Sequence, residues 1–325
     1  MKAVLDKKET VSFIDNVKGY LLEYGIYIVF ILLCIILTLA NENFLTVDNV
    51  MNILRQISIN GIIAVGMTFI IITGGIDLSP GSVLAFSSIV ACDFAHPGQY
   101  PLIVSIIIGV GIGLLCGLAN GFIIAKGKVA PFIVTLGMLT TARGLTLVYK
   151  SGRPVIDLST SYNNIGGGYI IGIPIPVIIL IVVIVLANFI LKYTRFGRHV
   201  YAIGGNEVSA EVSGLNINKI KILVYGLAGT LTGLAGVILS SRVMAGTVVA
   251  GQGYELDAIA AVVIGGTSLS GGKGSIKGTV IGALIIGVMN NGLDLLNVPS
   301  YYQQIVKGVI IVGAVYFDKK NNSKN

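Results

Sequence analysis

The sequence predicts an all-α polytopic membrane protein with about ten transmembrane helices and both termini in the cytoplasm. Of its 325 residues, 54% are hydrophobic and 11% are charged, and the mean hydropathy is +0.88. A soluble domain, in contrast, carries roughly 25% charged residues. The 43 glycines are typical of helices that pack closely in lipid. The phrase Gly-Gly-x-x-Leu-Ser occurs at 74–79 and again at 265–270, each time between apolar runs.

Eight apolar stretches are long enough, or nearly so, to cross a hydrocarbon core that needs about 20 helical residues. They are Tyr24–Ala40, Ile57–Thr73, Leu102–Ala125, Val129–Tyr149, Ile173–Leu191, Ile222–Ser240, Gly278–Leu296 and Tyr302–Phe317. Two shorter stretches, near Gly81–Ala95 and Asp257–Ser270, adjoin or contain the Gly-Gly phrases. The predicted organisation is a cytoplasmic segment 1–23, a transmembrane domain 24–317 and a cytoplasmic tail 318–325.

The distribution of charge decides whether the two shorter stretches cross. Cytoplasmic loops carry the excess of Lys and Arg, and the basic N-terminus places the start of the chain inside. If both short stretches cross, most of the 22 basic residues face the cytoplasm; otherwise the loop from Lys192 to Lys221 or the C-terminal lysines move outside. Ten crossings is therefore the consistent solution. The net charge of +7 is then explained by basic loops that orient the protein and lie beside the anionic inner leaflet. A nucleic-acid partner is not needed to explain it.

The two Gly-Gly phrases predict breaks in the helices at membrane depth, at Gly74 and Gly75 and at Gly265 and Gly266. Lipid cannot hydrogen-bond free backbone groups, so irregular backbone there must be covered by protein or line a cavity. A repeated break of this kind indicates a transport pathway.

Glycines spaced four residues apart predict smooth helix faces. They are Gly109, Gly113, Gly117 and Gly121, then Gly229 and Gly233, and then Gly278 and Gly282. We expect these faces to pack against other helices of the same chain rather than to form a seam between two copies.

The loop 192–221 is the only large polar region on the predicted cytoplasmic side. Asn206 is a favourable N-cap, Glu207 lies where a helix dipole favours negative charge, and Gly214 ends the pattern. The loop therefore predicts a short helix that lies parallel to the membrane. A soluble partner reaches it easily; the alternative is a passive connector.

Several segments together resemble one family. They are Tyr201–Glu207, Ser213–Lys221, Gly253–Val263 with Gly271–Gly274, Asn290–Leu293, Ser300–Gln303, Ala64–Thr68 and Gly75–Ser79. They resemble the permease subunit of ribose-type ATP-binding-cassette importers. The resemblance covers nearly the whole chain apart from its first twenty or so and last few residues. Pro80 departs from the family pattern, and we expect it to stiffen the first break.

The resemblance implies a transport subunit of a prokaryotic cell membrane that pairs with a second copy of itself. It also implies a cytoplasmic ATPase and an extracytoplasmic sugar-binding protein as partners. Closeness to the ribose branch implies ribose or a similar pentose as the substrate, with a hexose, a sugar-derived signal or a nucleoside as alternatives.

The chain has no ATP site of its own. A P-loop needs Gly-x-x-x-x-Gly-Lys followed by Ser or Thr. Around Gly272-Lys273, Thr267 stands where the first glycine is needed and Gly274 replaces the hydroxyl residue. We therefore expect no cofactor in this chain and no enzyme activity, with ATP and Mg²⁺ bound by the partner subunit.

The expected mechanism is a pull on the cytoplasmic helix. Closure of the ATPases would act on the Asn206–Gly214 segment, with Glu207 and Glu211 at the contact, and rigid bundles would rock the cavity open to the other side. The Gly-Gly breaks are the candidates for absorbing the bend.

Polar side chains at membrane depth mark the candidate pathway, because such groups are costly in lipid and usually functional. The set is Asn60, Thr73, Asp77, Ser79, Asn290 and Asn291. A structural role remains open for Asp77, as an acceptor for the free N–H groups of the short helix near Gly81. For the two late asparagines the alternative is hydrogen bonding between helices.

Three arginines at predicted outer helix ends, Arg55, Arg153 and Arg242, are candidates for docking the binding protein. Arginine pairs bidentately with carboxylates, so acidic rims on a binding protein would fit them. The alternative for each is an ordinary cation at a helix end.

Two rival classes of membrane protein share part of this pattern. An ion-coupled secondary transporter also uses broken helices, but it needs a proton or sodium site, and Asp77 and Asp294 are nearly the only intramembrane carboxylates expected. A membrane enzyme is disfavoured, because no nucleophile, base and orienting group converge by spacing, and no pair of His or Cys residues predicts a metal site.

Overall fold

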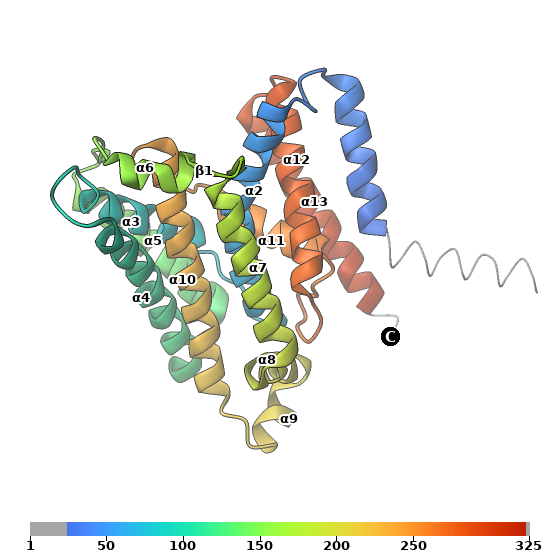
Figure 1. Ribbon diagram of the computed structural model, residues 1–325. Coiled ribbons are helices and arrows are strands. Elements are labelled where there is room, and N and C mark those ends of the chain that lie inside the picture. Colours follow the sequence, from blue (N-terminus) through green and yellow to red (C-terminus); the bar gives the residue numbers. More distant parts are fainter. Residues whose placement is uncertain (1–24, 323–325) are drawn as a thin grey trace, which may run out of the picture.

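Most of the chain folds into long helices that run up and down along one common direction (Figure 1). The computed structural model describes residues 25–322, so the predicted segment 1–23 and the last residues of the predicted tail lie outside the described part. The all-α membrane class is confirmed: among residues 25–322, six helices are long and apolar enough to cross a bilayer, namely α2, α4, α5, α7, α10 and α12.

Most long helices overlap the predicted apolar stretches, but the helix that contains Ile57 already begins at Val47, and the one that contains Asp257 ends at Ile264 rather than at Ser270. In chain order the helices are Gly25–Ala40, α2 (Val47–Ile72), α3 (Pro80–Asp93), α4 (Leu102–Gly127), α5 (Pro131–Tyr149), α6 (Thr160–Gly167), α7 (Ile175–Tyr193), α8 (Arg195–Gly205), α9 (Glu207–Val212), α10 (Ile217–Val243), α11 (Tyr254–Ile264), α12 (Ile276–Leu295) and α13 (Ser300–Asn322). A small antiparallel hairpin pairs β1 (Tyr169–Ile170) with β2 (Ile173–Pro174). Helix α13 runs on into the predicted tail 318–325.

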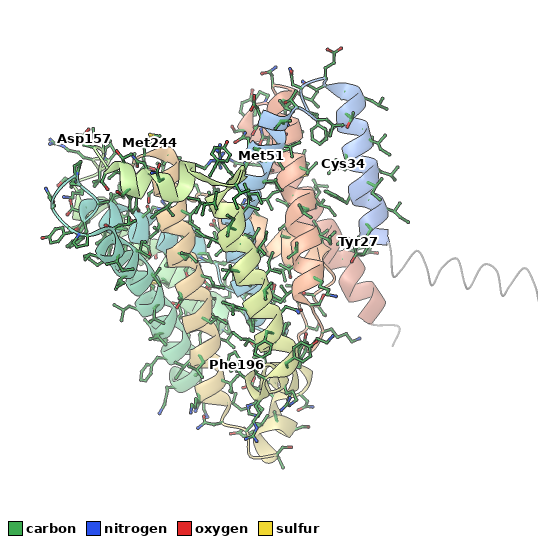
Figure 2. The ribbon with its side chains drawn as sticks, viewed as in Figure 1. Tyr27, Cys34, Met51, Asp157, Phe196 and Met244 are labelled. Carbon is green, nitrogen blue, oxygen red and sulfur yellow. The ribbon has the colours of Figure 1, made fainter. Side chains whose placement is uncertain are left out.

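The bundle has two distinct ends. One carries α6 and the hairpin, and the opposite one carries α8 and α9 (Figure 1). We call them the α6 end and the α9 end. In Figure 2, Asp157 and Met244 lie at the α6 end, whereas Phe196 of α8 lies towards the α9 end. Large apolar side chains are exposed along the flanks of the bundle, as lipid-facing surfaces require.

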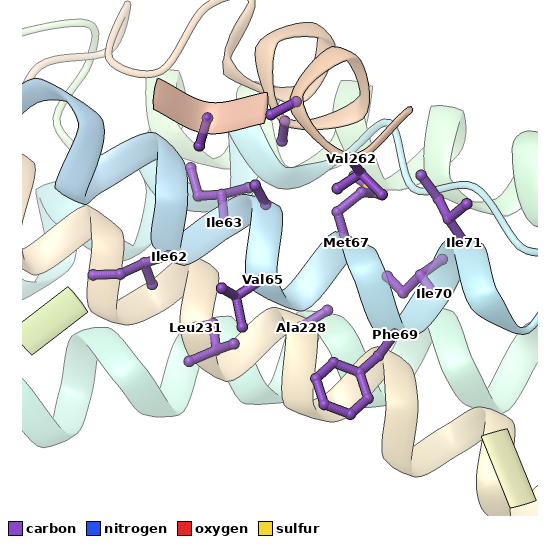
Figure 3. Packing of buried hydrophobic residues seen from close by; sticks show 14 of the residues in the cluster. Ile62, Ile63, Val65, Met67, Phe69, Ile70, Ile71, Ala228, Leu231 and Val262 are labelled. Atoms are coloured by element: carbon purple, nitrogen blue, oxygen red, sulfur yellow. The ribbon is translucent and has the colours of Figure 1, made fainter. Parts of the chain in front are cut away.

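Helix α2 forms the centre of the core. Every residue from Ile57 to Thr73 is buried, and a helix that is apolar all round belongs inside a bundle. Figure 3 shows Val65 of α2 facing Leu231 of α10, and Met67 facing Val262 of α11. The second half of α2 therefore lies between α10 on one side and α11 on the other.

The glycine faces pack within the chain, as predicted. A Cβ atom at Gly113 of α4 would overlap the carbonyl oxygen of Gly229 on α10, and one at Gly117 would overlap the carbonyl oxygen of Tyr225. At Gly111, on another face of α4, a Cβ would meet nothing. Gly282 of α12 lies in the same way against the backbone of α11.

Helices α3 and α11 are too short to cross a membrane alone. They have 14 and 11 residues, or about 21 and 17 Å at 1.5 Å per residue, against a hydrocarbon core of about 30 Å. Gly81 near the start of α3 lies against the Gly251 carbonyl group and the Glu255 carboxylate near the start of α11. The N-terminal ends of the two helices therefore meet inside the bundle, and non-helical chain (73–79 and 244–253) leads to each.

Candidate functional site

The two Gly-Gly phrases, far apart in sequence, meet at the α9 end. The N–H of Gly272, just after the second phrase, donates to the carbonyl oxygen of Ile72, just before the first, at 2.9 Å. Gly204 of α8 lies against both of these backbone groups. Tyr201 of α8 donates its hydroxyl to the Gly274 carbonyl oxygen at 2.7 Å. We call this contact of α2, α8 and the loop 265–275 the glycine junction.

Each phrase follows the end of a helix. Helix α2 ends at Ile72 and Gly74 has φ +77°, whereas α11 ends at Ile264 and Gly266 has φ +82°. Thr73, Gly74 and Gly75 line a cavity of about 150 Å³ with Glu207 and Lys221 of the polar loop. The first phrase thus begins near the α9 end, and the chain that follows it, up to Gly81, reaches the interior of the bundle.

The polar loop 192–221 contains two helices, of which α9 has the predicted caps. The Asn206 side chain accepts the N–H of Ser209 at 2.8 Å, and Gly214 has φ +83°. Helix α8 was not predicted, because its polar sequence gives a weak helix signal. Its buried face, which includes Val200 and Ile203, packs into the bundle.

Helix α9 projects from the α9 end (Figure 1). Val208 and Val212, one turn apart, are 71% and 85% exposed. Glu207 forms an ion pair with Lys221 at 2.7 Å, whereas Glu211 is exposed beside it. The two valines are therefore the most exposed apolar side chains of the polar loop.

Asp77 and Ser79 form a polar cluster that links α3 to α4. The carboxylate Oδ1 of Asp77 accepts the backbone N–H of Ser79 at 2.8 Å and the Ser79 hydroxyl at 2.6 Å. Asn120 of α4 donates to the same Ser79 hydroxyl at 3.1 Å. This geometry supports the structural alternative for Asp77, which satisfies backbone at the start of α3. Pro80 then occupies the first helical position, where its missing N–H costs nothing.

A second polar cluster surrounds Asp257 of α11, deep in the bundle. Its Oδ2 accepts from Asn60 of α2 at 3.4 Å, Asn290 of α12 at 3.3 Å and Lys307 of α13 at 3.0 Å. Lys307 also lies 2.9 Å from Oδ1. The amide oxygens of Asn60 and Asn290 are buried and have no hydrogen-bond partner among the described residues. Four helices therefore converge on one ion pair, with two spare acceptors beside it.

The six predicted pathway residues do not form one site. Asn60 and Asn290 come together at Asp257, and Asp77 and Ser79 form the separate cluster at α3. Thr73 lies at the cavity near α9. Asn291 makes a reciprocal amide pair with Asn49 near the start of α2, at 2.8 and 3.0 Å, which is the predicted alternative of bonding between helices.

The sequence prediction missed Asp257 and Lys307. Asp294 is exposed near the end of α12, where Gln303 donates to it at 2.8 Å. Asp257 is 3% exposed, and its position within the apolar run Tyr254–Ile264 was the available signal.

The arginines at the α6 end lie on different elements. Arg55 of α2 lies over the Tyr169 ring, with the guanidinium carbon 4.6 Å from the ring centre. Arg242 of α10 donates to Asn52 at 2.7 Å, and Arg153 is exposed in the loop after α5. None of the three forms an ion pair with a carboxylate of the described residues.

Comparison with known proteins gives matches along almost the whole chain. Residues 49–315 match the family model described as branched-chain amino acid transport system / permease component. The ribose import permease protein RbsC of Bacillus subtilis is 50% identical over 307 residues, covering 94% of this chain and 95% of that protein.

Other relatives are similar in extent. RbsC of Haemophilus influenzae is 48% identical, covering 98% of this chain and 99% of that protein. The xylose transport system permease protein XylH of the same organism is 37% identical, covering 92% and 97%. No solved structure matches the chain.

Proposed function

The chain belongs to the family of branched-chain amino acid transport system permease components, and from this membership we propose that it is the membrane subunit of a ribose importer. The family name refers to amino acids, but the relatives with about half of their residues identical are named ribose import permeases. The importer is of the ATP-binding-cassette type. Its energy comes from ATP and Mg²⁺ bound by a separate subunit, since the residues around Gly272-Lys273 do not form a P-loop.

The proposed mechanism rests on one observation: the exposed helix α9 is connected through α8 to both helix breaks. Helix α9 presents Val208 and Val212 to a partner, and α8, one residue away along the chain, contacts Ile72 and Gly272 through Gly204. A movement of α9 imposed by an ATPase would therefore reach α2 and the loop after α11 together. This is a physical connection between two sites, which coupling requires.

The assembly that we propose has two copies of the chain, each with ten crossings in a prokaryotic plasma membrane. The α9 end faces the cytoplasm, because Arg195, Arg198, Lys219 and Lys221 lie there and basic loops stay inside. Helices α3 and α11 complete their crossings with the non-helical chain that precedes each of them. Such segments are tolerated at membrane depth because the bundle covers them.

The sugar would pass the cluster around Asp257. The free amide oxygens of Asn60 and Asn290 are suited to accept from sugar hydroxyls, whereas Lys307 neutralises the carboxylate so that it does not hold a cation. At the α6 end, Arg153, which is exposed, and Arg55 and Arg242, which are partly buried, would meet carboxylates of an extracytoplasmic sugar-binding protein.

Reversing the charge of α9 tests the proposal. In cells that contain the ATPase and the binding protein but no other ribose permease, the wild-type chain should restore uptake of labelled ribose. The double variant Glu207→Lys, Glu211→Lys should insert normally, lose co-purification with the ATPase and lose uptake. Xylose and allose, offered in excess, should compete more weakly than unlabelled ribose.

Glu42→Lys is the matched control, because Glu42 is exposed on the turn before α2 at the opposite end. This variant should keep the ATPase bound. Normal uptake by the double variant would remove α9 from the mechanism. Uptake driven by an ion gradient without any ATPase would instead support a secondary transporter.

A further inference from the structure

A basic cavity lies at the α9 end, beside the glycine junction, with which it shares Tyr201. It encloses about 400 Å³ between the end of α7, α8 and the start of α12. Lys192, Arg198 and Lys277, one from each of these elements, lie at its wall, and Leu191 and Ile276 supply apolar lining. It is separate from the cavities that adjoin α9.

The three cations have no counter-charge in the described part of the chain. The ion pairs there join other residues, and no carboxylate lines the cavity. Tyr201, which also lines it, adds no charge at neutral pH, because the usual pKa of a tyrosine hydroxyl is about 10 and burial raises it further. Like charges around one cavity repel one another, so an anion between them would be stabilised.

The chemistry of the cations favours a phosphate group. The planar guanidinium of Arg198 can donate two parallel hydrogen bonds to phosphate oxygens, and the lysines add point charges. Basic pockets between helices at the cytoplasmic side of a membrane are known to suit anionic lipid headgroups.

The neighbouring surface of α7 distinguishes a lipid from a soluble anion. Val185, Leu186 and Phe189 are 60%, 55% and 55% exposed and lead along α7 towards Lys192. Phe189 and Tyr193 form an aromatic pair with ring centres 5.8 Å apart, and the Lys192 ammonium lies 5.4 Å from the centre of the Tyr193 ring. Aromatic rings beside a lysine are typical of the level of the lipid headgroups. An exposed apolar surface of α7 therefore adjoins Lys192 at the cavity and leads into the region of the acyl chains.

We propose that this cavity binds the headgroup phosphate of an anionic phospholipid, with the acyl chains lying along α7. The proposal depends on the proposed function only for the orientation that assigns the lipid to the cytoplasmic leaflet. Since Arg198 belongs to α8, a bound lipid would also hold α8 against α7 and α12.

Native mass spectrometry of the full chain, purified with defined lipid, tests the proposal. Wild-type protein should retain phosphatidylglycerol and release phosphatidylcholine of the same chain length. The triple variant Lys192→Gln, Arg198→Gln, Lys277→Gln should retain phosphatidylglycerol at least about tenfold less, since a surface cation contributes about 1 kcal/mol to binding an anionic lipid. Single variants, of which Lys192→Gln is one, should each weaken retention and serve if the triple variant does not fold.

The matched control is Lys126→Gln, Arg195→Gln, Lys219→Gln. It removes two lysines and one arginine that are exposed at the same end but do not line the cavity. It should retain the lipid as wild type does. Equal loss in both triple variants would show a diffuse surface-charge effect and overturn the site.

Two further outcomes would overturn the proposal. Equal retention of phosphatidylcholine by the wild type would show that the cavity does not distinguish an anionic headgroup from a zwitterionic one. Displacement of phosphatidylglycerol by millimolar inorganic phosphate, but not by chloride of equal ionic strength, would assign the cavity to a soluble phosphate. All of these readouts are independent of transport, so they stand even if the ribose proposal fails.

Discussion

The two Gly-Gly-x-x-Leu-Ser phrases have the same pattern and different surroundings. In both, the N–H of the final serine bonds to the side chain two residues earlier: Ser79 to Asp77 at 2.8 Å, and Ser270 to Ser268 at 3.3 Å. The first phrase passes directly into α3 at Pro80. The second passes into a loop with Gly271 and Gly272 in the left-handed region before α12 begins.

The helix ends differ by one residue. In the first phrase Gly75 donates to Ile70 and Gly74 to Ile71, so Gly74 is the left-handed residue that ends α2. In the second, Thr267 donates to Val262 and Gly266 to Val263, so Gly266 has that role. Both are Schellman endings, but the first glycine of one phrase corresponds to the second glycine of the other.

The shift has a packing reason. In the second phrase Gly265 is the C-cap residue of α11, and it lies against the backbone of Gly278 on α12, where a side chain would overlap the carbonyl group. In the first phrase, Gly75 faces the Tyr225 hydroxyl of α10. The shared phrase therefore determines that a helix ends there and that a hydrogen bond forms between the final serine and the side chain two residues before it. Contacts with the neighbouring helix determine which of the two glycines adopts the left-handed conformation.

The largest expected effect lies where the two phrases meet. Gly204→Ala would place a methyl group on the carbonyl oxygen of Ile72 and the N–H of Gly272. Overpacking of this kind costs about 1–3 kcal/mol, and 1.4 kcal/mol is a factor of ten. We expect uptake of labelled ribose to fall by at least about fivefold.

Gly205→Ala is the control for this change, because a Cβ there meets nothing within 4 Å. It should leave uptake near the wild-type rate. If Gly204→Ala also transports normally, the contact between the phrases does not carry the coupling, and each phrase acts alone.

Most of the helices could be predicted from the sequence, because long apolar runs bounded by polar loops determine them. The α9 caps at Asn206 and Gly214 were predictable too, since capping is a local property. The glycine junction was not, because nothing in the residues around Gly204 indicates that Ile72 and Gly272 lie beside it.

The candidate site was predicted less completely than the fold. Asn60 and Asn290 were found as polar residues in apolar runs, but their shared partner Asp257 was missed. A contact among α2, α11, α12 and α13 depends on how whole helices pack. Helix α8 was missed because tertiary packing of its amphipathic face, rather than its helix propensity, stabilises it.

An intermediate effect is expected at the side chain that differs between the phrases. Asp77 accepts two hydrogen bonds in a buried site, so Asp77→Ala leaves the Ser79 N–H unsatisfied at a cost of about 1–3 kcal/mol. Asp77→Asn keeps an oxygen for the N–H and should cost less. Ser268→Ala loses only the long bond from Ser270 and should cost less still.

These losses can be measured by thermal unfolding in detergent. The chain has 3 cysteines, all free, and a thiol-reactive dye reports their exposure. Equal losses for Asp77→Ala and Ser268→Ala would contradict the view that only the first phrase depends on its side chain.

The smallest expected loss of stability concerns the left-handed glycines themselves, which occupy the first position of one phrase and the second position of the other. Gly74 and Gly266 have φ of +77° and +82°, and a Cβ at either meets nothing within 4 Å. Alanine at either position should therefore cost only backbone strain, about 1–2 kcal/mol, and the two losses in the dye assay should match. Asparagine, which tolerates the left-handed region better, should cost less than alanine at both. If alanine at Gly74 and asparagine at Gly74 destabilise equally, steric contact rather than backbone conformation controls the helix end, and the shift loses its explanation.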